Sequence, residues 1–307
     1  MRFLITIFFI TTAFTSLLAQ RNQIQIVSEN DSYTSINNDG YYTNGFKIAY
    51  KWRKKNADTI VLSRTNQLEI GQHIYNARHG LLWALSSMDR PITGYLYGSF
   101  QQTNFNKKQD VLRWEISAGT IGKPAFGEEV QNLIHKIVNV SKVTQWKYQL
   151  RPGFGINASA IWSPQVVKNS DLKKFDIKPI ASATLGNIFT NATIGSAVLL
   201  GKFNENIRSN FWDNHYGDSK NQKEFFFYFY PAIHVQAYNA TVQGSMFNDQ
   251  TEIIEGKLNP VFFHGIAGIV YARSKYSLSY VGANEGKQSL AQKKGQLYGS
   301  IQVAFRW

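Results

Sequence analysis

The chain has 307 residues, no cysteine, and 33 Lys and Arg residues against 20 Asp and Glu, which gives a formal net charge of +13. The lack of cysteine excludes a fold held by disulfides, and the positive balance calls for an anionic partner, either nucleic acid or a phosphorylated lipid surface. The cations are scattered over predicted loops and no nucleic-acid-binding motif occurs, so we favour the lipid surface and expect no nucleic-acid partner.

The first nineteen residues predict a secretory signal peptide. Arg2 supplies a short positive start, and Phe3 to Ala19 form an apolar run that gives way to polar sequence at Gln20. The run is shorter than the ~20 apolar residues of a spanning helix and contains five Thr or Ser residues, which disfavours a membrane anchor. We therefore expect cleavage after Ala19 and one exported domain over residues 20–307.

Alternating apolar and polar residues predict a β-barrel in the exported part. No later stretch reaches the roughly 18 apolar residues of a spanning helix, so a closed barrel is the remaining way to cross a bilayer. Aromatic residues make up 14% of the chain, and many lie near the ends of alternating segments. The predicted strands cover residues 22–29, 43–53, 64–75, 92–104, 109–121, 147–163, 173–188, 190–203, 224–239, 252–273, 275–283 and 295–307.

Twelve is an even number, as bacterial single-chain barrels require, and it places both termini in the periplasm. In the fifth segment Leu112 and Ile116 alternate with Arg113 and Glu115, so the first pair is predicted to face lipid and the second the lumen. The last segment alternates up to the terminal aromatic residue Trp307. The fold class is therefore all-β, a twelve-stranded antiparallel transmembrane β-barrel in the bacterial outer membrane. Residues 204–223 fit this scheme poorly, because they are long for a periplasmic turn.

The external connection from Gly122 to Gln145 predicts a short helix over residues 127–139. An apolar face is expected from Val130, Ile134, Ile137 and Val138, at the spacing of an amphipathic helix. Gln131 and His135 are four residues apart and would project side by side. A single His on such a helix is more often a surface or packing residue than a catalyst, so both interpretations stay open at this point.

The external end of the first strand concentrates oxygen-bearing side chains. Glu29, Asn30 and Asp31 are followed after a polar stretch by residues 39–45, which include Thr43. Carboxylate and amide oxygens are suitable ligands for a hard cation such as calcium. Asn and Asp are also common in turns, and the residues alone favour a turn over a metal site.

Several motifs in register resemble the LpxR-type lipid A 3'-O-deacylases. The resemblance is dense over residues 22–150 and weaker afterwards. The motifs are Glu29-Asn30-Asp31, Tyr41-Tyr42-Thr43-Asn44-Gly45, Gln72-His73-Ile74-Tyr75, Asp89-Arg90-Pro91 with Gly94-Tyr95-Leu96-Tyr97, Gly119-Thr120-Ile121-Gly122, Gln131-Asn132-Leu133-Ile134-His135 and Trp146-Lys147-Tyr148-Gln149-Leu150.

The resemblance implies a twelve-stranded outer-membrane barrel that uses calcium to hydrolyse the ester of the 3'-linked acyloxyacyl group of lipid A. It implies an active site between the barrel wall and an external helix, facing the outer leaflet. The resemblance implies that His135 corresponds to the family's catalytic base. It likewise implies that Asn30 and Asp31 correspond to the family's paired Asn and Asp, and Thr43 to its site threonine. These assignments make Asn30 and Asp31 the expected calcium ligands.

The residues also suggest a direct attack by water. A positioned His acting as a general base accelerates ester hydrolysis by roughly 10² to 10⁴-fold, and a calcium ion can stabilise the oxyanion. Helix geometry makes Gln131 a candidate to orient water or substrate.

Lipid A phosphates need cations, and the candidates are Arg78, His79, Arg90 and Lys142. Where the family has a Lys-Arg pair after the third strand, this chain has Arg78 and His79. Where the family has Glu six residues beyond the base, it has Ser141. These differences from the family leave open how strongly the chain binds the substrate.

Two other functions compete with the deacylase. One is an outer-membrane phospholipase with a Ser nucleophile beside a His. No predicted strand has His and Ser two residues apart, the spacing that would place both on one face of the wall, and this counts against it. The other is a non-enzymatic porin-like barrel, in which the helix would be a plug. We expect a monomer, although nothing in the sequence fixes the oligomeric state.

Overall fold

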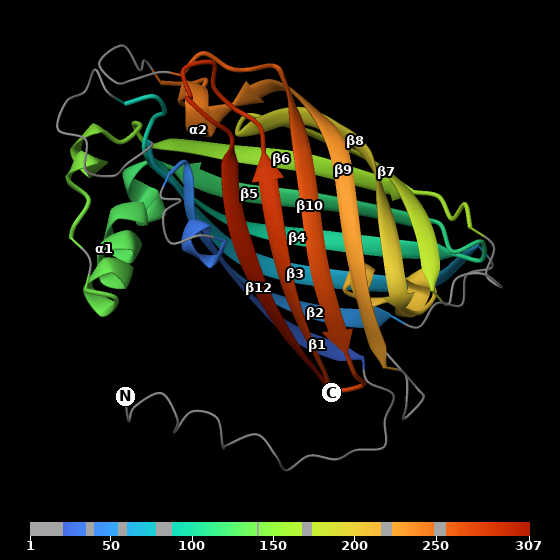
Figure 1. The fold of residues 1–307 in the computed structure, drawn as a ribbon. Coiled ribbons are helices and arrows are strands. Elements are labelled where there is room, and N and C mark those ends of the chain that lie inside the picture. The colour runs from blue at the N-terminus through green and yellow to red at the C-terminus, as the bar shows by residue number, and fades with distance from the viewer. Residues whose placement is uncertain are drawn as a thin grey trace.

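The computed structural model describes residues 21–34, 40–54, 60–77, 88–139, 141–167, 174–215, 223–248 and 256–307. In these residues the chain forms a closed antiparallel barrel in which each strand pairs with its neighbours in sequence and β12 pairs with β1 (Figure 1). The strands are β1 (Asn22–Asn30), β2 (Tyr42–Lys54), β3 (Val61–Tyr75), β4 (Thr93–Asn106), β5 (Val111–Ile121), β6 (Gly153–Ser163), β7 (Phe175–Gly186), β8 (Phe189–Lys202), β9 (Glu224–Asn239), β10 (Val261–Ala272), β11 (Tyr276–Glu285) and β12 (Gln296–Arg306). The predicted twelve-stranded barrel is confirmed.

The side-chain alternation separates a lipid-facing wall from a polar lumen. In β5, Leu112 and Ile116 are about half exposed on the outside, as predicted. In β9, Phe225, Phe227 and Phe229 face outward and are about half exposed, whereas Phe226 between them is fully buried. Apolar residues on the outer wall are what hydrocarbon requires, and none of the helices among the described residues is long and apolar enough to cross a membrane.

Two strands start more than five residues later than predicted. β6 begins at Gly153 instead of residue 147, because Thr144–Tyr148 forms the 3₁₀ turn η5, and β10 begins at Val261 instead of residue 252. Proline immediately precedes both strands, at Pro152 and Pro260. Proline has no backbone N–H to give to a strand ladder, which favours a strand start just after it.

The segment after β8, which the sequence did not place, closes the barrel at the end opposite α1 (Gly127–Ile137) (Figure 1). Its turns η6 (Asn206–Arg208) and η7 (Asn210–Trp212) are largely buried. Contacts run to several strands: Lys51 of β2 forms an ion pair with Asp213, and Arg113 of β5 donates to the carbonyl oxygen of Trp212. Strands β8 and β9 nevertheless pair directly, so the strand order is as predicted.

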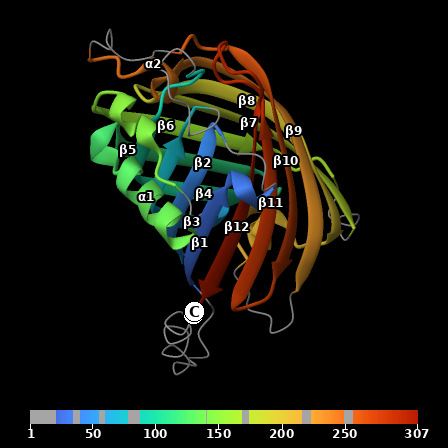
Figure 2. The same cartoon turned by 60° about the vertical axis from the view of Figure 1, so that its left-hand side comes forward.

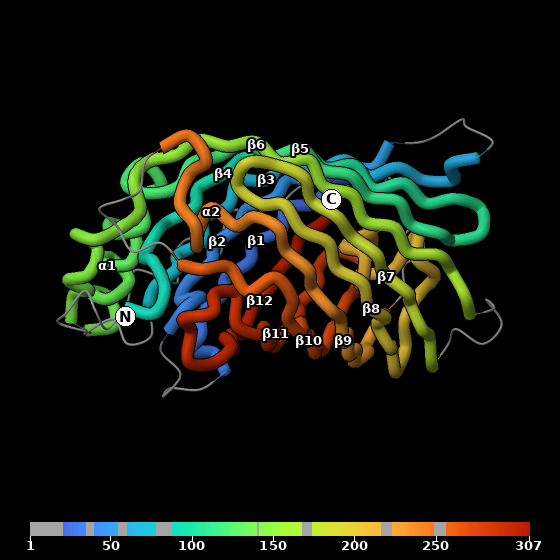
Figure 3. The backbone as a smooth tube through the Cα atoms, turned by 90° about the horizontal axis from the view of Figure 1, so that it is seen from above, coloured from blue at the N-terminus to red at the C-terminus, as the bar shows by residue number. Residues whose placement is uncertain are grey.

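The outer end of the barrel carries the two α-helices. Figures 1 and 3 both place α1 and the short helix α2 (Ala240–Gln243) at the same end of the barrel. Figure 2 shows α1 outside the wall, alongside the ends of the first strands. The predicted external helix is therefore confirmed, and it covers part of the lipid-facing surface instead of plugging the lumen.

Candidate functional site

A pair of asparagines marks the outer end of the wall at β1 and β2. Ile24 and Ile26 of β1 and Phe46 and Ile48 of β2 are exposed to the lipid side, so the alternation also turns Asn30 and Asn44 outward. The two asparagines face each other across the strands, and Asn30 Nδ2 donates to Asn44 Oδ1 at 2.6 Å. Polar side chains thus follow the exposed apolar residues at the outer ends of these strands.

Thr43 lies beside this pair in a β-bulge. Tyr42 pairs with Tyr75 and Asn44 with the adjacent Ile74, so Thr43 is an extra residue in β2. Its side chain is buried and its Oγ1 has no hydrogen-bond partner among the described residues. Bulges re-aim side chains and are frequent near active sites, and a buried hydroxyl without a partner is free to accept a ligand.

The residues after Asn30 form a short ordered turn, η2 (Asp31–Tyr33). Asn30 caps it, because its Oδ1 accepts from the backbone N–H of Ser32 at 2.7 Å. Asp31 is 4% exposed and its carboxylate accepts from the backbone N–H of Gly40 at 3.0 Å. The turn interpretation of this segment is therefore correct, and it leaves Asn30, Asp31, Thr43 and Asn44 as oxygen-bearing neighbours in one region.

Turn η2 lies against the outer face of β12. A Cβ placed on Gly299 would come within 2.6 Å of Tyr33 Cβ, so only glycine lets the turn approach this closely. Tyr33 is held at both ends: its hydroxyl lies 2.9 Å from Ser28 Oγ, and its carbonyl oxygen accepts from the Tyr280 hydroxyl at 2.8 Å. These contacts fix the position of Asn30 and Asp31 on the wall.

Helix α1 is seated on the wall three strands away from β1. A Cβ on Gly94 of β4 would lie 3.0 Å from Ala125 Cβ and 3.2 Å from Gly127 Cα, so the helix start rests directly on a glycine. Gln72 of β3 donates to the Ala125 carbonyl oxygen at 2.6 Å. Ile74, which is paired with Asn44 on one side and Gly94 on the other, is covered by Val143 and Trp146. The loop from β5 to β6 thus adheres to the wall next to the asparagine pair.

The apolar face of α1 differs in part from the prediction. Val130 packs against the cluster formed by Ile74 and Trp146, but Ile137 is 75% and Val138 is 59% exposed. The helix ends at Ile137, so the last predicted position lies outside its regular turns. An exposed apolar face is acceptable for a helix at the membrane surface, where hydrocarbon can cover it.

His135 is oriented on α1 by a backbone carbonyl. Its Nδ1 lies 2.6 Å from the carbonyl oxygen of Ser141. A carbonyl oxygen can only accept, so the proton is on Nδ1 and the lone pair of neutral His135 is on Nε2. The main chain at Ser141 therefore orients the imidazole of His135.

The prediction for Gln131 is wrong. Gln131 is 1% exposed, and its Oε1 accepts from the indole Nε1 of Trp146 at 2.8 Å. It therefore holds α1 to the loop and does not face water or substrate. The partner is fifteen residues away in sequence, which helix periodicity does not predict.

The prediction for Arg90 is also wrong. Arg90 is fully buried, stacks on the Tyr75 ring at 4.3 Å and donates to Thr241 Oγ1 and Gln288 Oε1, both at 2.9 Å. Burial lowers the pKa of its guanidinium to about 10. It ties the outer loops together and cannot reach a lipid phosphate. Lys142 is exposed, and Arg78 and His79 lie outside the described residues.

A calcium ion is compatible with the side chains at the asparagine pair. Among the described residues no three His, Cys, Asp or Glu side chains gather closely enough to hold a metal by themselves. Calcium, however, takes amide, hydroxyl and carbonyl oxygens besides carboxylates. Asp31 supplies a buried carboxylate, and Thr43 Oγ1 is a buried oxygen without a partner, so the donor set fits a hard cation.

The fold and this outward-facing site define an integral outer-membrane β-barrel with polar chemistry on its lipid side. The sequence matches the family described as outer membrane protein LpxR over residues 3–307, and the chain belongs to that family. No curated protein matches the chain.

Two solved structures are similar to the chain to different degrees. LpxR from Salmonella typhimurium superposes with a TM-score of 0.77 at 19% identity, covering 92% of this chain and 99% of that one. The β domain of the Bordetella autotransporter BrkA reaches a TM-score of 0.48 at 8% identity, with 94% and 99% of the two chains covered. At 19% identity, the likeness to the Salmonella structure shows the fold alone.

We predict that Gly94→Val detaches α1 from the wall while the barrel stays folded. The new side chain would collide with the backbone of Gly127. Gly98→Val is the matched control, because Gly98 faces outward on the same strand and a Cβ there meets nothing closer than 3.9 Å. Trypsin should cut near Lys136 and Lys142 faster in the Gly94 variant than in the wild type or the control. Equal cleavage in all three would contradict this seating of the helix.

Proposed function

We propose that this chain is a calcium-dependent lipid A 3'-O-deacylase that acts in the outer leaflet. The observation that carries the proposal is the orientation of His135, whose Nε2 lone pair is left available on a helix seated on the lipid side of the wall. An ester that reaches this site comes from the membrane and not from the lumen. Family membership supports the same activity.

His135 acts as the general base in this scheme. Its Nε2 takes a proton from water while the water oxygen attacks the acyl carbonyl carbon, and the same proton can then pass to the leaving alkoxide. The Ser141 carbonyl oxygen keeps the imidazole in the required tautomer and stabilises the imidazolium that forms. No acyl-enzyme is needed.

Asn30, Asp31, Thr43 and Asn44 would hold the calcium ion. When bound there, calcium supplies a positive charge that stabilises the oxyanion of the tetrahedral intermediate. The capping bond of Asn30 and the bulge at Thr43 keep these oxygens in place without the ion. Lys142, and Arg78 and His79 by the sequence argument, are the remaining candidates to meet the lipid phosphates.

A serine phospholipase mechanism has less support. His135 contacts the backbone of Ser141 and not its hydroxyl. A hydroxyl-imidazole pair does occur between Thr193 Oγ1 and His234 Nδ1 at 2.8 Å. Both residues alternate with the exposed Ile194 and Ile233 and therefore point into the lumen, away from lipid.

Mass spectrometry of lipid A tests the activity and the base together. We expect purified wild-type protein to remove the 3'-linked group, and His135→Ala to be slower by roughly 10² to 10⁴-fold, the usual contribution of a general base. Lys136→Ala is the control, because Lys136 is the exposed next residue of the same helix. A wild type that leaves every acyl chain in place defeats the proposed activity, and full activity in His135→Ala defeats the assignment of the base.

Calcium binding can be measured without turnover. We predict that Asp31→Asn weakens calcium binding in a calorimetric titration by at least about tenfold, because it removes the carboxylate charge that a hard cation prefers. Asp110→Asn, in the periplasmic turn after β4, should bind as the wild type does. If Asp31→Asn retains wild-type affinity, calcium is held elsewhere.

A further inference from the structure

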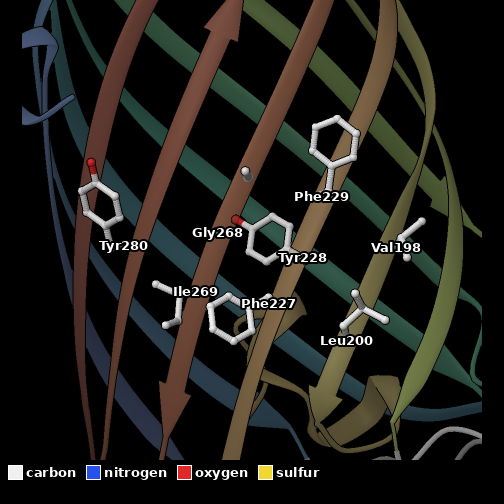
Figure 4. A pocket seen from close by; sticks show the side chains of 9 residues that line it. Val198, Leu200, Phe227, Tyr228, Phe229, Gly268, Ile269 and Tyr280 are labelled. Carbon is white, nitrogen blue, oxygen red and sulfur yellow. The ribbon is translucent and has the colours of Figure 1, made fainter. Parts of the chain in front are cut away.

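The lipid-facing wall has a hollow of about 570 Å³ over β8 to β11, which we call the outer groove (Figure 4). Its rim includes Leu200, Phe227, Phe229 and Tyr280, each 41–52% exposed on the outside of the barrel. Ala267 and Gly268 of β10 lie between these larger residues. The lining is almost entirely apolar, so the groove suits hydrocarbon.

Strand register explains why the wall is hollow here. Leu200, Phe227, Ile269 and Tyr280 are paired across four strands and form a row of large side chains. The next row toward the extracellular end of the barrel is Phe229, Ala267, Gly282 and Gly299. After Phe229 this row contains only alanine and glycine. A Cβ on Gly282 would meet only the Ala267 carbonyl oxygen, at 4.0 Å, so the space above this row is open.

The row of small residues leads to the candidate site. Gly299 is paired with Asn30, the first residue of the asparagine pair. With strands spaced about 4.8 Å apart, Ala267 is three spacings, or about 14 Å, from Asn30 along the row. Among the described residues, Tyr33 of η2 lies on Gly299 between them, next to the hydroxyl of Tyr280.

The row also descends into the membrane in the direction of a lipid chain. Gly299 is the fourth residue from the outer end of β12, which is Gln296. Phe229 is the eleventh residue from the outer end of β9, which is Asn239. An occupant that starts beside η2 therefore passes from the outer rim toward the middle of the bilayer.

One edge of the groove is bonded to the turn that carries the site. The hydroxyl of Tyr280 donates to the carbonyl oxygen of Tyr33 at 2.8 Å, so this hydroxyl is already satisfied and need not be matched by the ligand. The occupant can be purely apolar, and its position is coupled to that of Asn30 and Asp31 through η2.

We propose that the outer groove binds an acyl chain that remains on the substrate, while the ester to be cut lies on the other side of Tyr33. The inference rests on the proposed function and adds a second binding subsite to it. A broad headgroup with several acyl chains can straddle η2 and use both sites. The groove would thus select multiply acylated lipids over lipids with two chains.

Ala267→Phe fills the groove and is the test of this subsite. The control is Ala160→Phe, on the outer wall of β6, where the alanine is also exposed. For multiply acylated lipid A we expect Ala267→Phe to raise KM about tenfold, equivalent to the loss of roughly two buried CH2 groups, with kcat unchanged. Neither variant should change hydrolysis of a short-chain ester. Equal KM values for Ala267→Phe and the control would overturn the proposal.

A binding measurement separates this proposal from the activity. Native mass spectrometry in detergent can measure how much lipid A stays bound to two variants, His135→Ala and His135→Ala/Ala267→Phe. Retention by the first and loss from the second supports the subsite. Retention by both, or phospholipid retained in place of lipid A, overturns it. The two proposals can fail separately. If the wild type does not deacylate lipid A but Ala267→Phe still reduces lipid A retention, the proposed function is wrong and the outer groove is still a lipid A binding site.

Discussion

Hydrocarbon offers no hydrogen bonds, and this constraint determines how the outer wall is built. Most outward positions are apolar, and the polar exceptions at Asn30 and Asn44 are paired with each other. They are flanked by η2 on Gly299 and by the helix loop on Gly94. Two glycines at outward positions therefore let chain segments cover a polar spot on the lipid side, which is where an enzyme acting on membrane lipids needs one.

Loop contacts also strengthen the two ends of the barrel. Residues after β8 fill one end of the barrel and bond to Lys51 and Arg113, while Arg90 ties the loops at the other end. The turns after β8 and Arg90 therefore brace the two ends of the barrel. The outer groove lies in the same lipid-facing surface as the candidate site, and Tyr280 at its edge is hydrogen-bonded to η2.

Alternation predicted the twelve strands because lipid and lumen impose opposite polarity on successive residues. The segment after β8 has no such periodicity, and its partners lie on strands far away in sequence. Gln131 and Arg90 were misassigned for the same reason, since Trp146, Thr241 and Gln288 decide their roles. Outward glycines did not locate the covered part of the wall either, because Gly94 and Gly299 are covered whereas Gly98 and Gly282 are open.

In the proposed function, lipid reaches the site from outside the wall. A photoreactive residue at Phe46, which is 48% exposed just below Asn44, tests it most directly against one at the lumenal Gln101. In membranes containing lipid A, illumination should attach lipid A at position 46 and none at position 101. Capture of lipid A from the lumenal position, or none from position 46, would contradict the account.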